Sequence, residues 1–313
     1  MKKILIICLC IIILLCGCAA PESMHGEEDG KISIVTTIFP LYDFARNIAG
    51  NKANVTMLVT FGAEVHSYEP TPRDIIKIID SDLFINLGSS VDEWTKKITE
   101  ASDGKRLNTL SAMEAVDIKN EETVEGMESE HGHSEHSAEP DEHIWTSPKN
   151  AGLIAEKICE ELEKIDPENE NYYRDNAKSY IHELNELDSE IRTIVENSKR
   201  KTIVFADRFP MRYFADEYGL KYFAAFPGCS SESEPSASTI SFLIGKVNDE
   251  HIPVVFFTET SDGKVADTIC EASKAIKLQF HSCHNITKRQ FDDGVTYIGL
   301  MKQNLKALQT ALN

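Results

Sequence analysis

The stretch Asp166–Asn197 reads DPENENYYRDNAKSYIHELNELDSEIRTIVEN, and it decides the architecture that we expect. Asp166 and Pro167 start a helix, after which apolar side chains recur at three- and four-residue spacing from Ala177 to Val195. About thirty helical residues span roughly 45 Å, which is more than one lobe needs. We therefore expect one long helix, residues 166–198, to join two lobes.

Short apolar runs alternate with helical patterns on both sides of this helix. Before it, we expect strands at Ile32–Thr37, Asn54–Thr60 and Asp82–Leu87, and helices at Pro40–Ala49, after the capping box Thr71–Asp74, at Asp92–Ala101 and from Ser147 to Ile165. After it, we expect strands at Thr202–Ala206, Lys221–Phe226, Pro253–Thr258 and Lys277–Phe280, and a closing helix at Val295–Leu312. This alternation predicts an α/β fold with two lobes, residues 32–165 and 199–313, each a mainly parallel β-sheet flanked by helices.

The first residues, MKKILIICLCIIILLCGCAA, have the layout of a lipoprotein signal peptide. Two lysines precede the apolar run Ile4–Leu15, whose 12 residues are too short for a comfortable membrane span. The next residues, up to Cys18, match a bacterial lipobox, which we favour over an ordinary signal peptide or an uncleaved anchor. We expect residues 1–17 to be removed, Cys18 to be lipidated, and residues 18–31 to tether the protein at the extracellular face of the bacterial cytoplasmic membrane.

The segment Glu128–Trp145, ESEHGHSEHSAEPDEHIW, gathers potential metal ligands. It holds four histidines among six acidic residues, with no Lys or Arg. Imidazole and carboxylate are the ligands that borderline divalent metals prefer, Zn²⁺ above all, whereas a run this polar cannot bury a core. Composition alone favours a metal-attracting loop and a solvated linker about equally for residues 119–142. The loop histidines to which we assign weak accessory binding are His131, His133 and His136.

Charge narrows the choice of partner. The net charge is −19, and residues 121–142 alone carry nine acidic side chains and no basic one. This balance argues against nucleic acid and suits the attraction of cations.

Four further side chains are expected to lie close together. His66, Asp207 and His281 each follow a predicted strand, and in α/β sheets ligands gather beyond the carboxyl ends of strands. His143 stands between the acidic loop and the helix that begins near Ser147. Four such ligands suit a tetrahedral zinc shell. We therefore predict a metal site in the cleft between the lobes, made by His66, His143, Asp207 and His281.

Each of these side chains also has an ordinary structural interpretation. A lone histidine is more often a surface or core residue than a ligand, and we give this interpretation to His25, His182 and His251. Asp207 stands next to Arg208 and is compatible with a simple ion pair. The alternatives that stay open for members of the set are Glu64, Glu69, Glu259 and His284.

The cysteines outside the signal peptide allow, but do not require, a disulfide in an extracellular protein. Cys159 and Cys270 fall in helical patterns and are expected to be small buried residues. Cys229 and Cys283 lie in predicted loops and are the better candidate pair.

At these residues the chain resembles the metal-receptor lipoproteins of bacterial ABC importers for zinc and manganese, the solute-binding protein family 9. The resemblance covers residues 31–313. The motifs that carry it are FGAEVHSYEPTPRD from residue 61, DEHIWTSP from residue 141, YGL from residue 218, FFTETSDGKVA from residue 256 and YIGLMKQNL from residue 297.

The resemblance implies two α/β lobes joined by a rigid helix, with one buried metal between them. It implies ligands at His66 and His143 by direct motif match. The third family position is commonly His or Glu and is Asp207 here, while the fourth is commonly Asp and aligns with His281. The chain therefore departs from the family pattern at the third and fourth positions.

The function implied by the resemblance is that of an extracytoplasmic receptor, not an enzyme. It captures Zn²⁺ as a monomer and delivers it to an ABC permease driven by a cytoplasmic ATPase. Zinc-type members of the family carry an acidic histidine-rich loop that manganese-type members generally lack. Imidazole-rich shells also favour zinc over Mn²⁺, so we expect zinc.

Three alternatives stay open. A manganese receptor of the same family would differ in native metal content. A zinc hydrolase would need an open coordination position and a general base, and no HExxH motif is present. A cell-surface adhesin would use the metal structurally, so that metal loss unfolds the chain.

Overall fold

The computed structural model describes residues 30–63, 68–89, 94–95, 97–98, 107–128, 139–228 and 234–313. Residues Ile32–Asn313 form one compact unit. In the part of the chain that is described, no helix is long and apolar enough to cross a membrane.

The N-terminal part, residues 32–165, is built on a parallel sheet. Its strands lie in the order β2 (Ala53–Met57), β1 (Ile32–Thr36), β3 (Leu83–Asn86) and β4 (Thr109–Ser111). Parallel strands need crossover connections, which α2 (Phe39–Ala49) and α3 (Pro72–Ile79) supply here. The helix α3 begins with the predicted capping box, in which Thr71 Oγ1 accepts from Asp74 N at 3.3 Å. A short 3₁₀ turn, η4 (Ala112–Ala115), follows β4.

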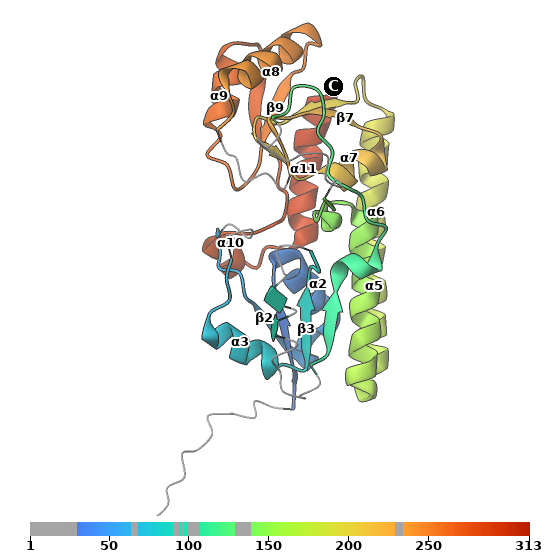
Figure 1. The fold of residues 1–313 in the computed structure, drawn as a ribbon. Coiled ribbons are helices and arrows are strands. Elements are labelled where there is room, and N and C mark those ends of the chain that lie inside the picture. Colours follow the sequence, from blue (N-terminus) through green and yellow to red (C-terminus); the bar gives the residue numbers. More distant parts are fainter. Residues whose placement is uncertain are drawn as a thin grey trace, which may run out of the picture. The chain divides into compact units, whose positions relative to one another are not determined.

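Two long helices carry the chain from the N-terminal to the C-terminal part. They are α5 (Pro148–Ile165) and α6 (Glu170–Glu196), and the 3₁₀ turn η6 (Pro167–Asn169) between them delays the start of α6 by four residues relative to Asp166. Figure 1 shows α6 beside α5 and, further along, beside α11 (Tyr297–Leu312); α6 also contacts α2. The buried stripe of α6 is Tyr173, Ala177, Tyr180, Leu184, Leu187, Ile191 and Val195. At 27 residues the helix is about 40 Å long, as a connector of two lobes requires.

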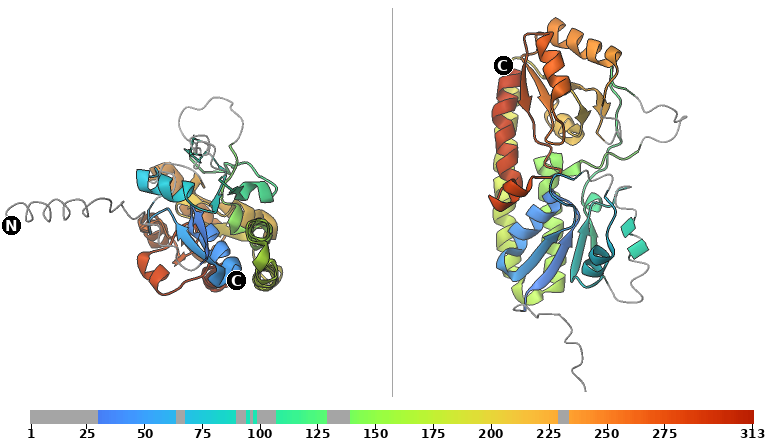
Figure 2. Two further views of the ribbon diagram at one scale, coloured as in Figure 1. Left: turned by 90° about the horizontal axis from the view of Figure 1, so that it is seen from below. Right: turned by 90° about the vertical axis from the view of Figure 1, so that its left-hand side faces the viewer.

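The C-terminal part, residues 199–313, pairs its strands in parallel. The pairs are β5 (Thr202–Val204) with β7 (Lys221–Phe223), β6 (Arg208–Phe209) with β8 (Phe226–Pro227), and β9 (Val254–Phe257) with β10 (Ile276–Gln279). The helices of this part besides α11 are α7 (Arg212–Tyr218), α8 (Ala237–Asp249), α9 (Lys264–Glu271) and α10 (Lys288–Asp292). Both α9 and α11 contact β9 and β10, and Figure 2 shows helices flanking these strands.

The predicted α/β class, with parallel sheets flanked by helices and one long connecting helix, is confirmed. One strand prediction is wrong in detail, because Lys221–Phe226 is divided into β7 and β8. The backbone N–H groups of Ala225 and Phe226 both donate to Asp207 O, at 3.1 and 3.3 Å, and this convergence interrupts the ladder. Most of the helix predicted at residues 92–101 lies outside the described residues, and the lobe boundaries at residues 165 and 198 stay predictions.

The hydrophobic core is continuous across both parts. The largest buried cluster runs from Ile34 of β1 to Leu312 of α11 and includes Trp145 and Tyr297. Tyr297 OH donates to Trp145 O at 2.6 Å, so the first turn of α11 is tied to the segment that holds His143. The segment that holds His143 is therefore packed into the core that both parts share.

Candidate metal centre

His143 lies at the junction between the acidic segment and α5. Just before it, Asp141 N donates to Lys119 O at 2.8 Å, which pairs the returning arm of the acidic segment with the outgoing arm. Just after it comes the 3₁₀ turn η5 (Ile144–Thr146), and α5 starts at the N-cap Ser147. The side chain of His143 is only 1% exposed.

Asp141 fixes the ring of His143. Its Oδ1 accepts from His143 N at 2.8 Å and faces His143 Nδ1 at 3.0 Å. With the proton on Nδ1, the lone pair of the neutral imidazole is on Nε2, the arrangement that carboxylate–histidine pairs have in zinc sites. Burial lowers the pKa of His143, but the charge and hydrogen bond of Asp141, with the charges of Glu142 and Glu121, outweigh burial and leave that pKa raised.

A second histidine, His284, belongs to a loop that Glu259 organises. This loop, His281–Ile286, follows β10, and Glu259 follows β9. Glu259 accepts from Ser282 N at 2.8 Å, from Ser282 Oγ at 2.7 Å and from His284 N at 3.1 Å. Both carboxylate oxygens thus accept hydrogen bonds from the loop, and Glu259 holds the backbone at His284 in place.

The same loop is held from α11 and bent at Cys283. Asn304 of α11 accepts from His281 N and donates to His281 O, both at 2.8 Å. Cys283 has a φ of 62°, in the left-handed region that non-glycine residues rarely adopt. This bend lies between His281 and His284, so the two side chains leave the loop toward different surroundings.

The structure brings His143 and His284 together. Their rings are edge to face with centroids 5.3 Å apart, and His284 is 6% exposed. The buried Trp145 ring lies against both imidazoles, 5.4 Å from His143 and 4.9 Å from His284, and Trp145 Nε1 donates to Ser282 O at 2.8 Å. His284, one of the open alternatives, is therefore the histidine of its loop that lies beside His143.

Gly228 lies close to the ring of His143. A Cβ at this position would lie 2.9 Å from Phe209 O and 3.1 Å from His143 Nδ1 and Cε1. Real Cβ atoms essentially never lie 2.9 Å from a backbone oxygen, so glycine lets the chain directly after β8 pack against Phe209 O and the imidazole.

His281 has other partners. Its Nδ1 accepts from Cys283 N at 2.9 Å and lies 3.3 Å from Glu259 Oε1. Its Nε2 is buried and has no hydrogen-bond partner among the residues that the structure describes. Within the part of the chain that the structure describes, the hydrogen bond and ion pair of the His281 side chain are thus with its own loop and with Glu259.

Asp207 stands where the sequence places it, just after β5. Its Oδ2 accepts from Thr258 N at 3.3 Å, and within the described residues its buried Oδ1 has no hydrogen-bond partner. Burial, only partly offset by hydrogen bonds, raises the pKa of Asp207 to about 6. Asp207 is thus a buried carboxylate beyond the carboxyl end of a strand, where ligands gather in α/β sheets, and it stays a candidate ligand.

His66 and Glu64 lie outside the described residues, but the chain just before them is anchored beside the His284 loop. Asn285 Nδ2 donates to Thr60 O at 2.9 Å and to Ala63 O at 2.8 Å. Ala63 is three positions before His66 in the sequence, and Asn285 is next to His284. In residues 30–63 and the later described segments, no group of three His, Cys, Asp or Glu side chains has metal-binding geometry. His66, the motif-matched candidate, lies outside the described residues.

The remaining predicted sites have mixed outcomes. His131, His133, His136, Cys18 and Cys229 lie outside the described residues. Cys283 is a free, buried thiol. Glu69 is exposed and lines a surface groove with Thr60 and Tyr68.

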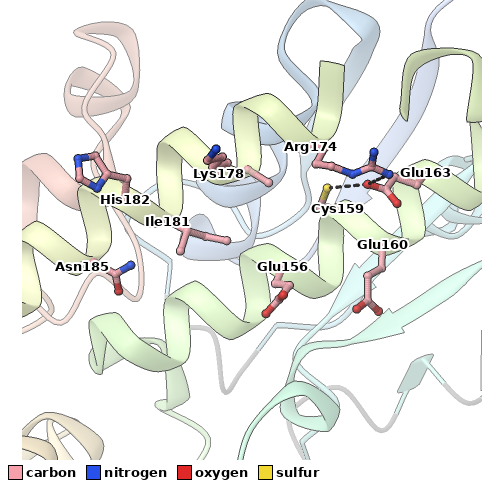
Figure 3. A pocket seen from close by; sticks show the side chains of 10 residues that line it. Glu156, Cys159, Glu160, Glu163, Arg174, Lys178, Ile181, His182 and Asn185 are labelled. Carbon is pink, nitrogen blue, oxygen red and sulfur yellow. Dashed lines mark hydrogen bonds and ion pairs between the residues drawn. The ribbon is translucent and has the colours of Figure 1, made fainter. Parts of the chain in front are cut away.

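A groove of about 580 Å³ lies elsewhere, between α5 and α6 (Figure 3). Its walls carry Glu163 and Arg174, which pair at 3.2 Å, and Cys159, whose Sγ donates to Glu163 at 3.6 Å. Burial raises the pKa of Cys159 to about 12, so the thiol stays protonated and is a poor metal ligand. His182 at this groove is 74% exposed and faces Glu186. The groove therefore does not offer two buried imidazoles, as the pair His143 and His284 does, and we do not assign a metal to it.

Sequence reasoning missed two functional features of this centre. In the sequence Asp141 stands only within an acidic run, although a carboxylate two positions before a candidate ligand is a usable signal. The sequence offers Glu259 as an alternative ligand, whereas both its oxygens hold the His284 loop. Its role depends on the approach of β9 and β10 and has no sequence signal.

Comparison with known proteins gives consistent matches over this chain. The family model of the zinc-uptake complex component A, periplasmic (ZnuA), matches residues 34–311. The high-affinity zinc uptake system protein ZnuA of Bacillus subtilis is 31% identical over 309 residues, which are 96% of this chain and 94% of that protein. The zinc-binding lipoprotein AdcA of Streptococcus pneumoniae is 32% identical, and the match covers 99% of this chain but only 61% of AdcA.

Among solved structures, the Zn(II)-bound ZnuA-like domain of the same streptococcal AdcA is similar in fold. The TM-score is 0.75 with 30% sequence identity, and the match covers 90% of this chain and 99% of that domain. The likeness thus extends over nearly all of the compact unit.

Proposed function

This chain belongs to the family of periplasmic component A proteins of zinc-uptake complexes, and from that premise we propose that it is the extracytoplasmic zinc receptor of an ABC-type importer. It binds Zn²⁺ and passes it to the membrane part of the transporter, and it acts as a receptor and not as an enzyme. The observation that carries the proposal is the buried pair of imidazoles, His143 and His284, with Asp141 holding the Nδ1 side of one ring.

The ligands that we assign are His66, His143 and His284, with Asp207 as the fourth candidate. His284 takes the place first given to His281, because His284 is the residue of that loop beside His143. Three imidazoles and one carboxylate suit zinc, and imidazole-rich shells favour zinc over Mn²⁺. The partners that we assign are a permease and its cytoplasmic ATPase.

Lipid attachment at Cys18 is the second element of the proposal. The lipobox-like residues before Cys18 support it, and the streptococcal relative is described as a lipoprotein. Replacing Cys18 by Ser should release the protein from the membrane fraction, with Cys159→Ser as a matched control that keeps it there. Membrane retention of the Cys18→Ser protein would contradict the anchor.

Zinc binding is tested by metal content and by titration. Protein purified without added metal should contain about one zinc and little manganese when analysed by mass spectrometry. In competition titrations with a chromophoric chelator, His66→Ala combined with His143→Ala should abolish tight binding, whereas the exposed-site control His182→Ala should bind as the wild type does. Unchanged affinity in the double variant would refute the assigned site, and native manganese would favour the manganese alternative.

A further inference from the structure

The position of His143 depends on Asp141, and Asp141 itself is held through its backbone. Asp141 N donates to Lys119 O at 2.8 Å. Asp141 O accepts from the hydroxyl of Tyr213 at 2.9 Å, and the same hydroxyl accepts from Lys119 N at 3.0 Å. Tyr213 is 2% exposed, and its hydroxyl therefore joins both arms of the acidic segment directly before His143.

The outgoing arm of that segment, Lys119–Glu128, is itself fixed to the C-terminal part, and we call it the strap. Glu122 forms an ion pair with Arg212 of α7, and Glu125 pairs with Lys246 of α8 at 3.0 Å. At its end, Glu128 N donates to Ala225 O at 3.0 Å. The strap is thus held against the C-terminal part of the chain. Tyr213, on α7, links the start of the strap at Lys119 to Asp141, the residue that orients the His143 ring.

We propose that Tyr213 is a positioning residue for the zinc site, acting through Asp141 on the ring of His143. This inference rests on the proposed zinc-binding function. The buried hydroxyl of Tyr213 accepts from Lys119 N and donates to Asp141 O, so its removal takes a partner from both backbone groups. We expect the backbone at Lys119 and Asp141 to shift as a result. Because Asp141 meets both His143 N and Nδ1, a shift of its backbone turns the imidazole away from the metal.

Tyr222 provides a matched control. Its hydroxyl also contacts the strap, donating to Glu122 Oε2 at 3.2 Å, and the residue is 7% exposed. Among the described residues its hydroxyl is hydrogen-bonded to Glu122 and Arg212, and it has no hydrogen bond to Asp141. Tyr222→Phe therefore removes a comparable hydrogen bond to the same strap and leaves the hydrogen bonds of Asp141 in place.

The experiment compares zinc affinity in the full-length wild type, Tyr213→Phe, Tyr222→Phe, Asp141→Asn and the double variant Tyr213→Phe with Asp141→Asn. Loss of a residue that orients a metal-binding histidine costs about 10- to 100-fold in affinity. We expect a loss of about tenfold for Tyr213→Phe and less than about twofold for Tyr222→Phe. In the Asp141→Asn background, Tyr213→Phe should add less than about twofold, because both changes break the same connection. The visible absorption of Co²⁺-loaded protein should change in Tyr213→Phe and stay unchanged in Tyr222→Phe.

The outcomes separate the two claims. If the wild type lacks tight zinc binding, the proposed function fails, and this inference with it. If the wild type binds zinc but the two tyrosine variants lose affinity equally, or the losses in the double variant multiply fully, only the positioning role is overturned. Should Tyr213→Phe fail to fold, Tyr213→4-aminophenylalanine, which keeps a donor toward Asp141 O, is used instead. It should retain affinity within about threefold of the wild type, and a loss as large as that of Asp141→Asn would overturn the role.

Discussion

The two regions that bring imidazoles to the centre are constructed in opposite ways. His143 ends a long acidic segment that is rich in histidine, and a carboxylate two positions before it orients its ring. His284 lies in the short loop HSCHNI, and its orientation comes from distant residues, Glu259 after β9 and Asn304 on α11. The His143 ring is thus held by a neighbour in the sequence, whereas the His284 loop is held by residues that are distant in the sequence.

The sharpest test of this comparison replaces each of the two histidines of the short loop by alanine in turn. His284→Ala should weaken zinc binding by about 100- to 1,000-fold, since a structural zinc site is worth about 10–16 kcal/mol shared among about four ligands. His281→Ala is the matched control, because it removes an imidazole from the same loop, and this imidazole contacts Cys283 N and Glu259. Competition titration measures both variants. A larger loss for His281→Ala would restore the original ligand set.

A smaller effect is expected from the scaffold of that loop. Glu259→Gln keeps the size of the side chain but replaces one acceptor oxygen by a donor, so the loop N–H groups lose part of their support. We expect zinc affinity to fall about tenfold and the zinc-free protein to lose about 1–3 kcal/mol of unfolding free energy. Titration and chemical denaturation check these values, with exposed Glu271→Gln on α9 as control. If Glu259→Gln binds zinc as tightly as the control, the loop does not need its scaffold.

Acid should act on the centre through His143. A proton must leave before Nε2 coordinates zinc, and the pKa of His143 is raised above its ordinary value of 6.5. Zinc affinity should therefore fall as the pH decreases through a value above 6.5, by about tenfold per pH unit for each proton taken up. Asp207, with a pKa of about 6, adds a further loss below that pH if it is a ligand.

Stability of the zinc-free protein should show the opposite sign. Because the folded-state pKa of His143 is raised, its stabilising contribution is fully present below pH 6.5 and is lost as the pH rises through the folded value. Titrations and thermal melts between about pH 5.5 and 8 measure both trends. Asp141→Asn should move the fall in affinity to lower pH, and affinity that does not vary with pH would argue against histidine ligands.

The smallest effect is expected from the histidine-rich residues themselves. Replacing residues 129–138 by a short Gly/Ser linker keeps the strap and should leave the tight affinity within about twofold, while weaker zinc binding by His131, His133 and His136 disappears. Deleting residues 121–140 is not equivalent, because it removes the ion pairs of the strap with Arg212 and Lys246. Loss of tight binding in the shorter deletion would return the acidic segment to the centre of the mechanism.

Much of the fold was predictable because local rules agree with the tertiary structure. The apolar spacing of residues 177–195 predicts the buried stripe of α6, and the Thr71 capping box predicts the start of α3. Lys221–Phe226 failed as a single strand because the carbonyl of Asp207 draws two successive N–H groups, a contact between chain segments that has no local signal.

The sequence by itself determined the chemistry of the centre: an α/β chain with histidines and carboxylates at strand ends, and motifs around His66 and His143 that indicate a metal receptor. The tertiary structure decided which residues meet. The sequence alone does not distinguish His281 from His284, because both lie in the same short loop. The left-handed bend at Cys283, together with the hydrogen bonds from Glu259 and Asn304, places His284 beside His143. The physical reason is that side-chain direction in a loop has no period, so it depends on hydrogen bonds from elements that are distant in the sequence.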